Sequence, residues 1–230
     1  MAERQIKSRE RVAHYGEVYT AEREVNAMLD LVKQETDRVD SRFLEPACGD
    51  GNFLAEILRR KLDAARRAAR IPKRKAIDTH AFERAAVTAA TSIYGVDILQ
   101  DNVDACRERM FRIWDEAYTA VCGREADDRC REAVRTILRL NIVCGNALSM
   151  RLVDIAGQDT DEPILFPEWS MIGDSLKRRD FRFDALLEDR EPDADYDLSL
   201  WEYDEAEKAY IPKPVAEYPL TDYRRVQEYG

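Results

Sequence analysis

The residues best suited to chemistry in this sequence surround two glycines between a short apolar stretch and a helical pattern. The apolar stretch covers residues 42–44, and the helical pattern begins at residue 52. The turn between them and the start of the helix contain Glu45, Pro46, Ala47, Cys48, Gly49, Asp50, Gly51, Asn52 and Phe53. A strand, a tight glycine turn and a helix N-terminus bring backbone N–H groups against a nucleotide-like ligand. Glycine also serves a turn that binds nothing, so the turn alone leaves both interpretations open.

Two later strand patterns also end at polar residues. The pattern over residues 92–97 ends at Asp97, where a carboxylate can accept hydrogen bonds from both hydroxyls of a ribose. The alternative is that Asp97 caps a helix that starts near Asp101. A third strand pattern covers residues 141–144, and Asn146 and Ala147 follow it. The side-chain carbonyl of Asn146 can accept a hydrogen bond from an amino group.

In this order the segments resemble the motifs of the S-adenosylmethionine-dependent DNA adenine (amino) methyltransferases, the class that includes restriction-modification M subunits. LEPACGDG at residues 44–51 resembles motif I, residues 92–98 resemble motif II, and residues 142–148 resemble motif III. Residues 14–21 resemble motif X. The resemblance covers roughly residues 12–150 and implies S-adenosyl-L-methionine as the cofactor. The cofactor-binding residues that it implies are Tyr19, Thr20, Glu45, Pro46, Ala47, Cys48, Gly49, Gly51, Asn52, Phe53, Asp97, Ile98, Asn146 and Ala147.

The sequence departs from the family pattern at two of these places. Ala21 replaces the proline that usually ends motif X, and Thr20 before it is also a good N-cap for a helix over residues 22–33. Asn146 stands where the family usually carries an aspartate that holds the adenine amino group. A neutral carbonyl oxygen there implies a weaker bond. Cys48 has no base nearby in the sequence, so we interpret it as a packing residue.

The motif that carries the chemistry in this family is missing. Adenine methyltransferases of the family have Asn-Pro-Pro-Tyr or Asp-Pro-Pro-Tyr after the fourth strand, where it polarises the amino group and stacks on a flipped base. The sequence contains neither tetrapeptide, and residues 181–187, the best candidate for the preceding strand, lead into Glu188–Pro192. Catalytic residues therefore stay unknown. Glu168 and Trp169 are the first to test if transfer occurs, the alternative for Trp169 being a buried indole that anchors a hairpin or loop.

Two functions remain open from the sequence. One is an S-adenosylmethionine-binding, DNA N6-adenine methyltransferase-like protein of a restriction-modification or phage-defence system, with a substitute for the missing motif or one supplied by a partner. The other is a non-catalytic methyltransferase-fold subunit that serves assembly or cofactor sensing in a multi-protein complex.

The charge of the chain is unevenly spread. The net charge is −10, but residues 151–230 carry 21 acids and 10 bases, while residues 1–150 are close to neutral. A dense basic stretch, Arg59–Lys75, could contact DNA phosphates, although such a run on a helix is more often a solvated face. The acidic C-terminal part argues against tight non-specific DNA binding. Its aromatic residues over 196–223 form either a docking region for a protein partner or an extra edge hairpin on the domain itself.

Strand patterns alternate with helical patterns, which indicates a parallel sheet. Helices are expected over residues 22–33, 52–70, 80–91, 102–121 and 127–139. We therefore predict an α/β, Rossmann-like class I methyltransferase fold with a parallel-rich sheet, helices on both faces and an irregular acidic C-terminal extension. Residues 1–156 form the cofactor-binding core, and residues 157–230 form the extension, which completes the sheet or docks a partner. Residues 196–203 and 208–215 are expected to pair as a hairpin.

Composition narrows the setting. No apolar run approaches the length of a membrane span, and the N-terminus lacks the apolar core of a signal peptide, so a cytoplasmic location and no membrane contact are expected. The five cysteines show no Cys-x-x-Cys spacing and there are two histidines, so reduced thiols and no metal site are expected.

Overall fold

A computed structural model describes residues 20–72, 74, 76–187, 201–205 and 208–229 of the chain. The first half contains α2 (Glu22–Asp30), α3 (Lys33–Thr36), β1 (Phe43–Glu45), α4 (Asn52–Ala68), α5 (Thr79–Thr91), β2 (Ile93–Asp97), α6 (Gln100–Cys122), η1 (Gly123–Glu125), α7 (Asp128–Asn141) and β3 (Ile142–Asn146). The second half contains β4 (Arg151–Val153), β5 (Asp159–Pro163), β6 (Leu165–Ile172), β7 (Ser175–Arg182), α8 (Phe183–Leu187), β8 (Trp201–Asp204), β9 (Ala209–Pro212), β10 (Ala216–Glu217), β11 (Thr221–Asp222) and η3 (Tyr223–Tyr229).

The expected order of strands and long helices in the first half is confirmed, with one helix shorter than predicted. The helix expected over residues 22–33 ends at Asp30, and α3 follows it separately. The prediction that Thr20 caps this helix is wrong, because the N-cap is Ala21 and no side chain of the described residues caps it. The apolar residues of α2 are only partly buried: Val25 and Leu29 face the core, while Met28 is 54% exposed.

The main sheet is mixed. Its five strands follow the order β1-β2-β3-β4-β5, with β1, β2 and β3 parallel and β4 and β5 added antiparallel. The expectation of a parallel-rich sheet therefore holds for the first three strands alone. After β3 the chain turns back at residues 147–150 and forms hairpins, so the strand–helix alternation ends there.

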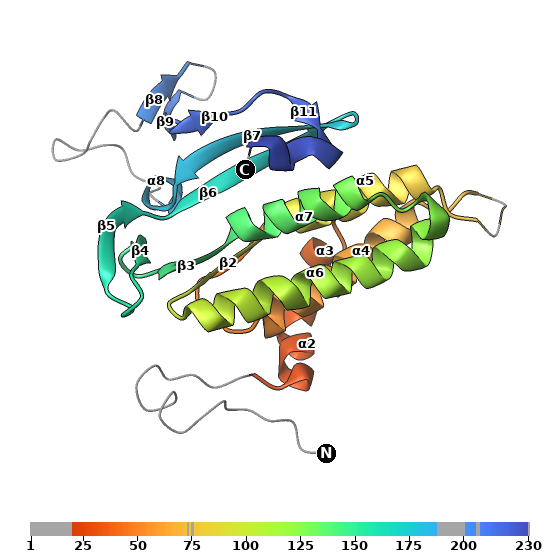
Figure 1. Ribbon diagram of the computed structural model, residues 1–230, viewed down its shortest axis with the longest axis horizontal. Helices are drawn as coiled ribbons and strands as arrows, with labels where there is room; N and C mark the ends of the chain where they lie inside the picture. Colours follow the sequence, from red (N-terminus) through yellow and green to blue (C-terminus); the bar gives the residue numbers. More distant parts are fainter. Residues whose placement is uncertain (1–19, 73, 75, 188–200, 206–207, 230) are drawn as a thin grey trace.

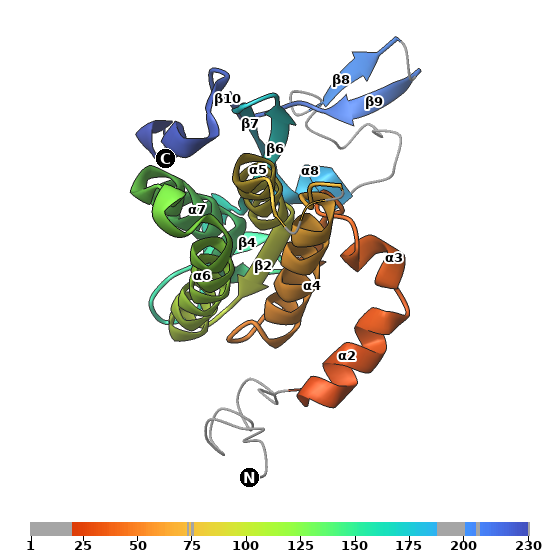
Figure 2. The same cartoon turned by 90° about the vertical axis from the view of Figure 1, so that its right-hand side faces the viewer.

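Helices and a β-hairpin pack against these strands (Figure 1). The helices α4 and α6 lie on one face, α5 and α7 run into the starts of β2 and β3 in the middle, and the β6–β7 hairpin lies on the other side (Figures 1 and 2). The expectation of helices on both faces does not hold for β1, β2 and β3, because the β6–β7 hairpin covers their second face. Two right-handed crossovers that advance in one direction along a sheet place their helices on the same face.

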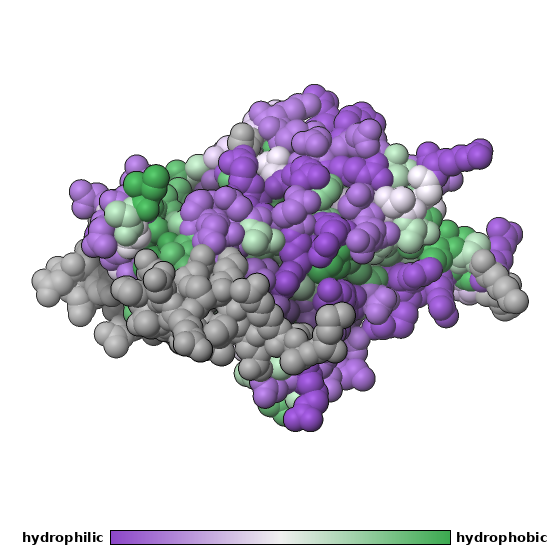
Figure 3. All heavy atoms as spheres, turned by 60° about the horizontal axis from the view of Figure 1, so that its bottom comes forward, coloured by the Kyte–Doolittle hydropathy of each residue, from purple (hydrophilic) through white to green (hydrophobic). Residues whose placement is uncertain are grey.

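A continuous core joins the layers. Leu54, Leu58 and Leu62 on α4 and Trp114 and Tyr118 on α6 are all almost fully buried. Stacked rings of this kind account for much of the apolar area that a domain removes from water. The Trp114 and Tyr118 rings stack with centroids 4.6 Å apart, and the Trp114 indole donates to the Ala86 carbonyl at 2.9 Å. Hydrophilic side chains predominate on the outer face that includes α2, α4 and α6 (Figure 3).

Within the basic stretch, Lys61 is completely buried. Its ammonium donates to the carbonyls of Arg38, Val39 and Ser41 at 2.9, 3.2 and 2.5 Å, so it joins α4 to the loop before β1. Burial lowers the pKa of Lys61 to about 8. Lys61 therefore cannot contact DNA as predicted. The guanidinium groups of Arg60 and Arg67 are paired with Asp30 and Asp37, which favours the alternative of a solvated, locally neutralised helix face.

The expectation of an irregular C-terminal extension is wrong for residues 159–182, which form β5, β6 and β7. The eight residues of β6 pair with those of β7 in register from Leu165↔Arg182 to Ile172↔Ser175. The inward face of β7 includes Arg178 and Asp180, a buried pair bonded twice at 2.7 Å. Two charged residues thus occupy core positions, so the sequence of β7 does not show the alternation of apolar and polar residues that would predict a strand. The boundary expected between residues 156 and 157 falls in the turn between β4 and β5.

Long-range hydrogen bonds attach the C-terminal half to the first half. The Trp169 indole on β6 is buried and donates to the Asn141 side-chain carbonyl at 2.9 Å, in agreement with the alternative interpretation of this residue. The Asn141 amide donates in turn to the Ile93 carbonyl at 3.1 Å. Farther on, β8 and β9 pair as the predicted hairpin, although residues 196–200 lie outside the described residues.

None of the helices in the described part of the chain combines the length and apolar character that a bilayer span needs.

Candidate functional site

A pocket opens where the carboxyl ends of β1, β2 and β3 meet. Its volume is about 620 Å³, which lies within the range of roughly 300–1,000 Å³ typical of small-molecule sites. Parallel strands place their following loops at one edge of a sheet, so three segments distant in sequence become neighbours here. The lining consists of Thr20, Glu45, Pro46, Ala47, Cys48, Gly49, Asp50, Asn52, Phe53, Asp97, Ile98, Leu99, Asn102, Gly145, Asn146, Ala147 and Leu148.

The turn after β1 has the backbone conformation that its glycines suit. Gly49 has φ of 53° and Gly51 has φ of 89°, both in the left-handed region that side chains disfavour. Its amides, however, bond within the protein. The Cys48 N–H donates to Val96 O and the Gly51 N–H to Cys48 O, both at 2.9 Å. The expectation that this turn presents its N–H groups to a ligand therefore does not hold for Cys48 and Gly51.

Asp97 is the centre of this arrangement. One carboxylate oxygen accepts from the Gly49 N–H at 2.9 Å, and the other accepts from the Leu99 N–H at 2.9 Å and the Asn102 amide at 3.2 Å. A carboxylate has about four acceptor positions, so these three bonds leave about one for a ligand hydroxyl. Asp97 fastens the glycine turn to the start of α6 and still borders the pocket. The alternative that Asp97 caps this helix is wrong, because the N-cap of α6 is Leu99 and no side chain in the described part of the chain caps it.

Asn146 ends β3 on the opposite wall. Its side-chain oxygen accepts from the Leu148 N–H at 3.0 Å, and its amide donates to Asp159 at 3.0 Å. The second lone pair of that oxygen can accept one further bond. Leu148 beside it is 94% exposed although it lines the pocket, so it supplies an apolar rim.

The electrostatic character of the pocket is acidic. Glu45 is half-buried, and desolvation raises its pKa, while a hydrogen bond from the Ala47 backbone acts in the opposite direction. Asp50 is paired with Arg109 at 3.2 Å, and the same guanidinium donates to the Asn52 side chain at 2.5 Å. Arg109 thus positions the start of α4, while Glu45 and Asp97 remain the acidic groups of the lining.

Most of the residues predicted for cofactor binding line this one pocket. Gly51 does not line it, although its neighbours Asp50 and Asn52 do, and a Cβ atom on Gly51 would come 2.6 Å from the Cys106 sulfur. Tyr19 lies outside the described residues. The sequence interpretation missed Asp50, Leu99, Asn102, Gly145 and Leu148 as lining residues.

Some of these missed lining residues could have been found from the sequence, and others could not. Asp50, Gly145 and Leu148 lie inside the motif segments and could have been included on that ground. Leu99 and Asn102 come after Asp97 on the way into α6, and their place depends on how the chain turns there.

The sulfur chemistry of the site is structural. Cys48 is buried. A hydrogen bond with Cys106 is the main cause that raises the pKa of its thiol, and desolvation is the second. Thiols of raised pKa are poor nucleophiles, which agrees with the interpretation of Cys48 as a packing residue. All five cysteines are free.

No family model, curated protein or solved structure matches this chain.

Proposed function

We propose that the chain binds S-adenosyl-L-methionine in the pocket at the carboxyl ends of β1, β2 and β3, as a DNA adenine methyltransferase-like protein of a restriction-modification or phage-defence system. One observation carries this proposal: the glycine turn, Asp97 and Asn146 border the same pocket. The motif segments that resemble the methyltransferases supply these residues. The acidic lining suits a ligand that carries a positive sulfonium and an ammonium group.

Each part of the cofactor has a candidate partner. Asp97 offers its remaining acceptor position to the ribose hydroxyls, and Asn146 offers its remaining lone pair to the adenine amino group. Ile98 and Phe53 are half-buried in the lining and provide apolar faces for the purine. Glu45 ends β1 where the glycine turn begins, and its carboxylate can pair with the ammonium group.

Titration calorimetry of the purified chain tests cofactor binding. We expect heat of binding with both S-adenosylmethionine and S-adenosylhomocysteine. Asp97→Asn keeps the shape but loses the charged acceptor, and should weaken binding by about 1–3 kcal/mol. Asp161→Asn makes the same chemical change on a fully exposed side chain outside the pocket and should leave affinity unchanged. An absence of heat with both ligands would reject the proposal.

The second candidate function, a non-catalytic subunit, is favoured by the course of the chain after β3. Residues 181–187, the expected strand before the catalytic motif, form the end of β7 and α8, and the sequence contains no Asn-Pro-Pro-Tyr. Trp169 is 7% exposed and hydrogen-bonded to Asn141, so it is unsuited to stack on a flipped base. Glu168 is held between Arg42 and Arg179.

We therefore expect the isolated chain to bind cofactor without transferring its methyl group. The measurement is incorporation of tritiated methyl into mixed-sequence DNA, with a known adenine methyltransferase as the positive control. Counts at background, together with heat of binding in the calorimeter, support the non-catalytic subunit. Transfer that disappears in Asp97→Asn would instead establish an autonomous enzyme.

A further inference from the structure

The outer edge of β1 offers free backbone hydrogen-bonding groups. The strand pairs with β2 in parallel, with Phe43↔Ile93, Leu44↔Tyr94 and Glu45↔Gly95 in register, and the Phe43 N–H donates to Ser92 O at 2.9 Å. In such a ladder alternate residues bond to the neighbouring strand, so the Leu44 N–H and C=O point away from β2. Among the described residues, no strand pairs with this edge.

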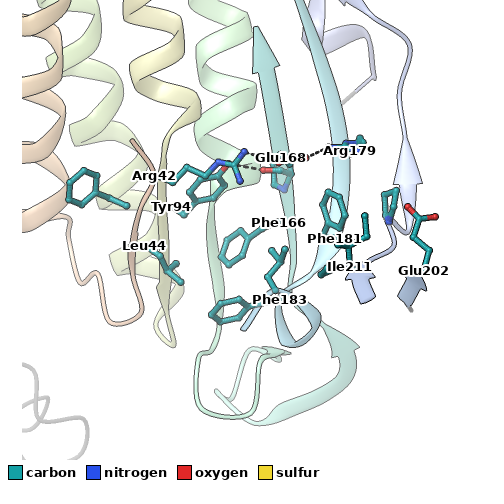
Figure 4. Close-up of a pocket in the computed structure, with 15 residues that line it drawn as sticks. Arg42, Leu44, Tyr94, Phe166, Glu168, Arg179, Phe181, Phe183, Glu202 and Ile211 are labelled. Atoms are coloured by element: carbon teal, nitrogen blue, oxygen red, sulfur yellow. Dashed lines mark hydrogen bonds and ion pairs between the residues drawn. The ribbon is translucent and has the colours of Figure 1, made fainter. Parts of the chain in front are cut away.

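An apolar groove runs beside this edge, between β1 and the β6–β7 hairpin (Figure 4). Its volume is about 360 Å³. The side chains of Leu44, Phe166 and Phe183 point into it, and β9 contributes Ile211 on the far side (Figure 4). Leu44 is 39% exposed, so an apolar side chain and an open strand edge are presented to solvent at the same place. This is the combination that proteins usually avoid unless another strand covers it.

Charged side chains close one end of the groove. Glu168 on β6 lies between Arg42, just before β1, at 2.8 Å, and Arg179 on β7, at 2.5 Å (Figure 4). Both arginines are more than 40% exposed, while the Glu168 side chain is 23% exposed. Two guanidinium groups share one carboxylate, so this end carries a surplus positive charge, while the other acidic residue of the lining, Glu202 on β8, lies on the side of Ile211 (Figure 4). An acidic side chain placed there would satisfy the remaining guanidinium donors.

We propose that an extended segment of a partner protein, in which apolar residues alternate with acidic ones, adds as a strand to the outer edge of β1. Its backbone bonds to the Leu44 N–H and C=O, its apolar side chains fill the groove, and an acidic side chain lies beside Arg42 and Arg179. Main-chain bonds supply affinity and alternate side-chain pockets supply specificity in this mode of recognition. The proposal is independent of cofactor binding, because the groove lies beside β1 and the cofactor pocket lies beyond its carboxyl end.

Hydrogen exchange of the isolated chain tests the open edge. The Leu44 amide should exchange faster than the amides of Phe43 and Glu45, which bond to β2. Slow exchange at Leu44 in the isolated chain would mean that the chain covers its own edge, and the proposal would fall.

Selection from a displayed library of random decapeptides tests the occupant. Selected peptides should alternate apolar and acidic residues. They should lose about tenfold in affinity when N-methyl groups are placed on the edge that bonds β1, and keep their affinity when the opposite edge is methylated. These peptide variants leave the protein unchanged, so protein folding cannot confound the result.

Leu44→Pro gives the matching change in the protein. It removes an N–H that has no partner in the sheet, and Leu44→Val is the control that keeps that N–H. Leu44→Pro should lose peptide binding while retaining the melting transition. Failure to enrich any alternating peptide, or binding that survives both N-methylation and Leu44→Pro, would overturn strand addition.

Discussion

Replacing Glu83 by alanine should lower the free energy of unfolding by about 3–5 kcal/mol, a large share of the stability of a domain of this size. Glu83 lies on α5 and is 3% exposed. Its carboxylate accepts from the Tyr118 hydroxyl, from the Tyr223 hydroxyl at 2.5 Å and from the Arg224 guanidinium at 2.6 Å. The substitution would leave two buried hydroxyl groups and one guanidinium without their shared acceptor.

The measurement is urea unfolding of the wild type and of three variants. Glu83→Gln keeps the shape and part of the hydrogen bonding, so its loss should be smaller than that of Glu83→Ala. Glu228→Ala breaks an ion pair with Arg225 on the same C-terminal helix, but the Glu228 side chain is 43% exposed, so the loss should be much smaller than that of Glu83→Ala. Similar losses for Glu83→Ala and Glu228→Ala would contradict a special role for the buried carboxylate.

The region expected to dock a partner, residues 196–223, has two parts that differ in burial. Tyr223 and Val226 are buried, and β10 and β11 pair with β7, so residues 216–226 are part of the fold. Tyr203 and Tyr210 on the β8–β9 hairpin are 54% and 47% exposed. Removing residues 216–229 should therefore abolish the melting transition, whereas the exposed hairpin remains the candidate for contacts with other proteins.

The sequence predicts the first half of the fold well because its signals are local. The apolar positions of α4 recur at helical spacing, and a glycine turn precedes the helix. Ends of parallel strands meet at one sheet edge, so the placement of Asp97 near the glycine turn also results from the order of elements. The hydrogen bond from Gly49 to Asp97 spans 48 residues, and no local pattern announces it.

The second half was harder to predict because its buried positions carry polar residues. Arg178 and Asp180 on β7 are both less than 10% exposed, and each satisfies the other, so a strand with a charged inner face appears irregular in the sequence. Glu83 and Lys61 on the helices are concealed in the same way, since their partners are tyrosines 35 and 140 residues away and backbone carbonyls 20–23 residues away. Periodicity identifies apolar faces; it does not identify buried polar networks.

Gly51→Ala should destabilise the protein by about 2–4 kcal/mol, because two separate costs act at one residue. The first is backbone strain, since a φ of 89° is unfavourable for any residue with a Cβ atom. The second is overpacking, since that Cβ atom would lie 2.6 Å from the sulfur of Cys106, which is completely buried. Gly51 precedes the first residue of α4, so relief of the clash would also move the turn that borders the pocket at the carboxyl ends of β1, β2 and β3.

Two further variants separate these costs. Gly157 has φ of 75° but nothing within 4 Å of an added Cβ atom, so Gly157→Ala reports the strain alone and should cost about 1–2 kcal/mol. Cys106→Ala removes the sulfur that the new Cβ atom would meet, so Gly51→Ala should cost less in that background. A double-mutant cycle by urea unfolding should give a favourable coupling of at least about 1 kcal/mol. Additive effects would show that the Cys106 sulfur moves aside freely, and strain alone would then explain the need for glycine at residue 51.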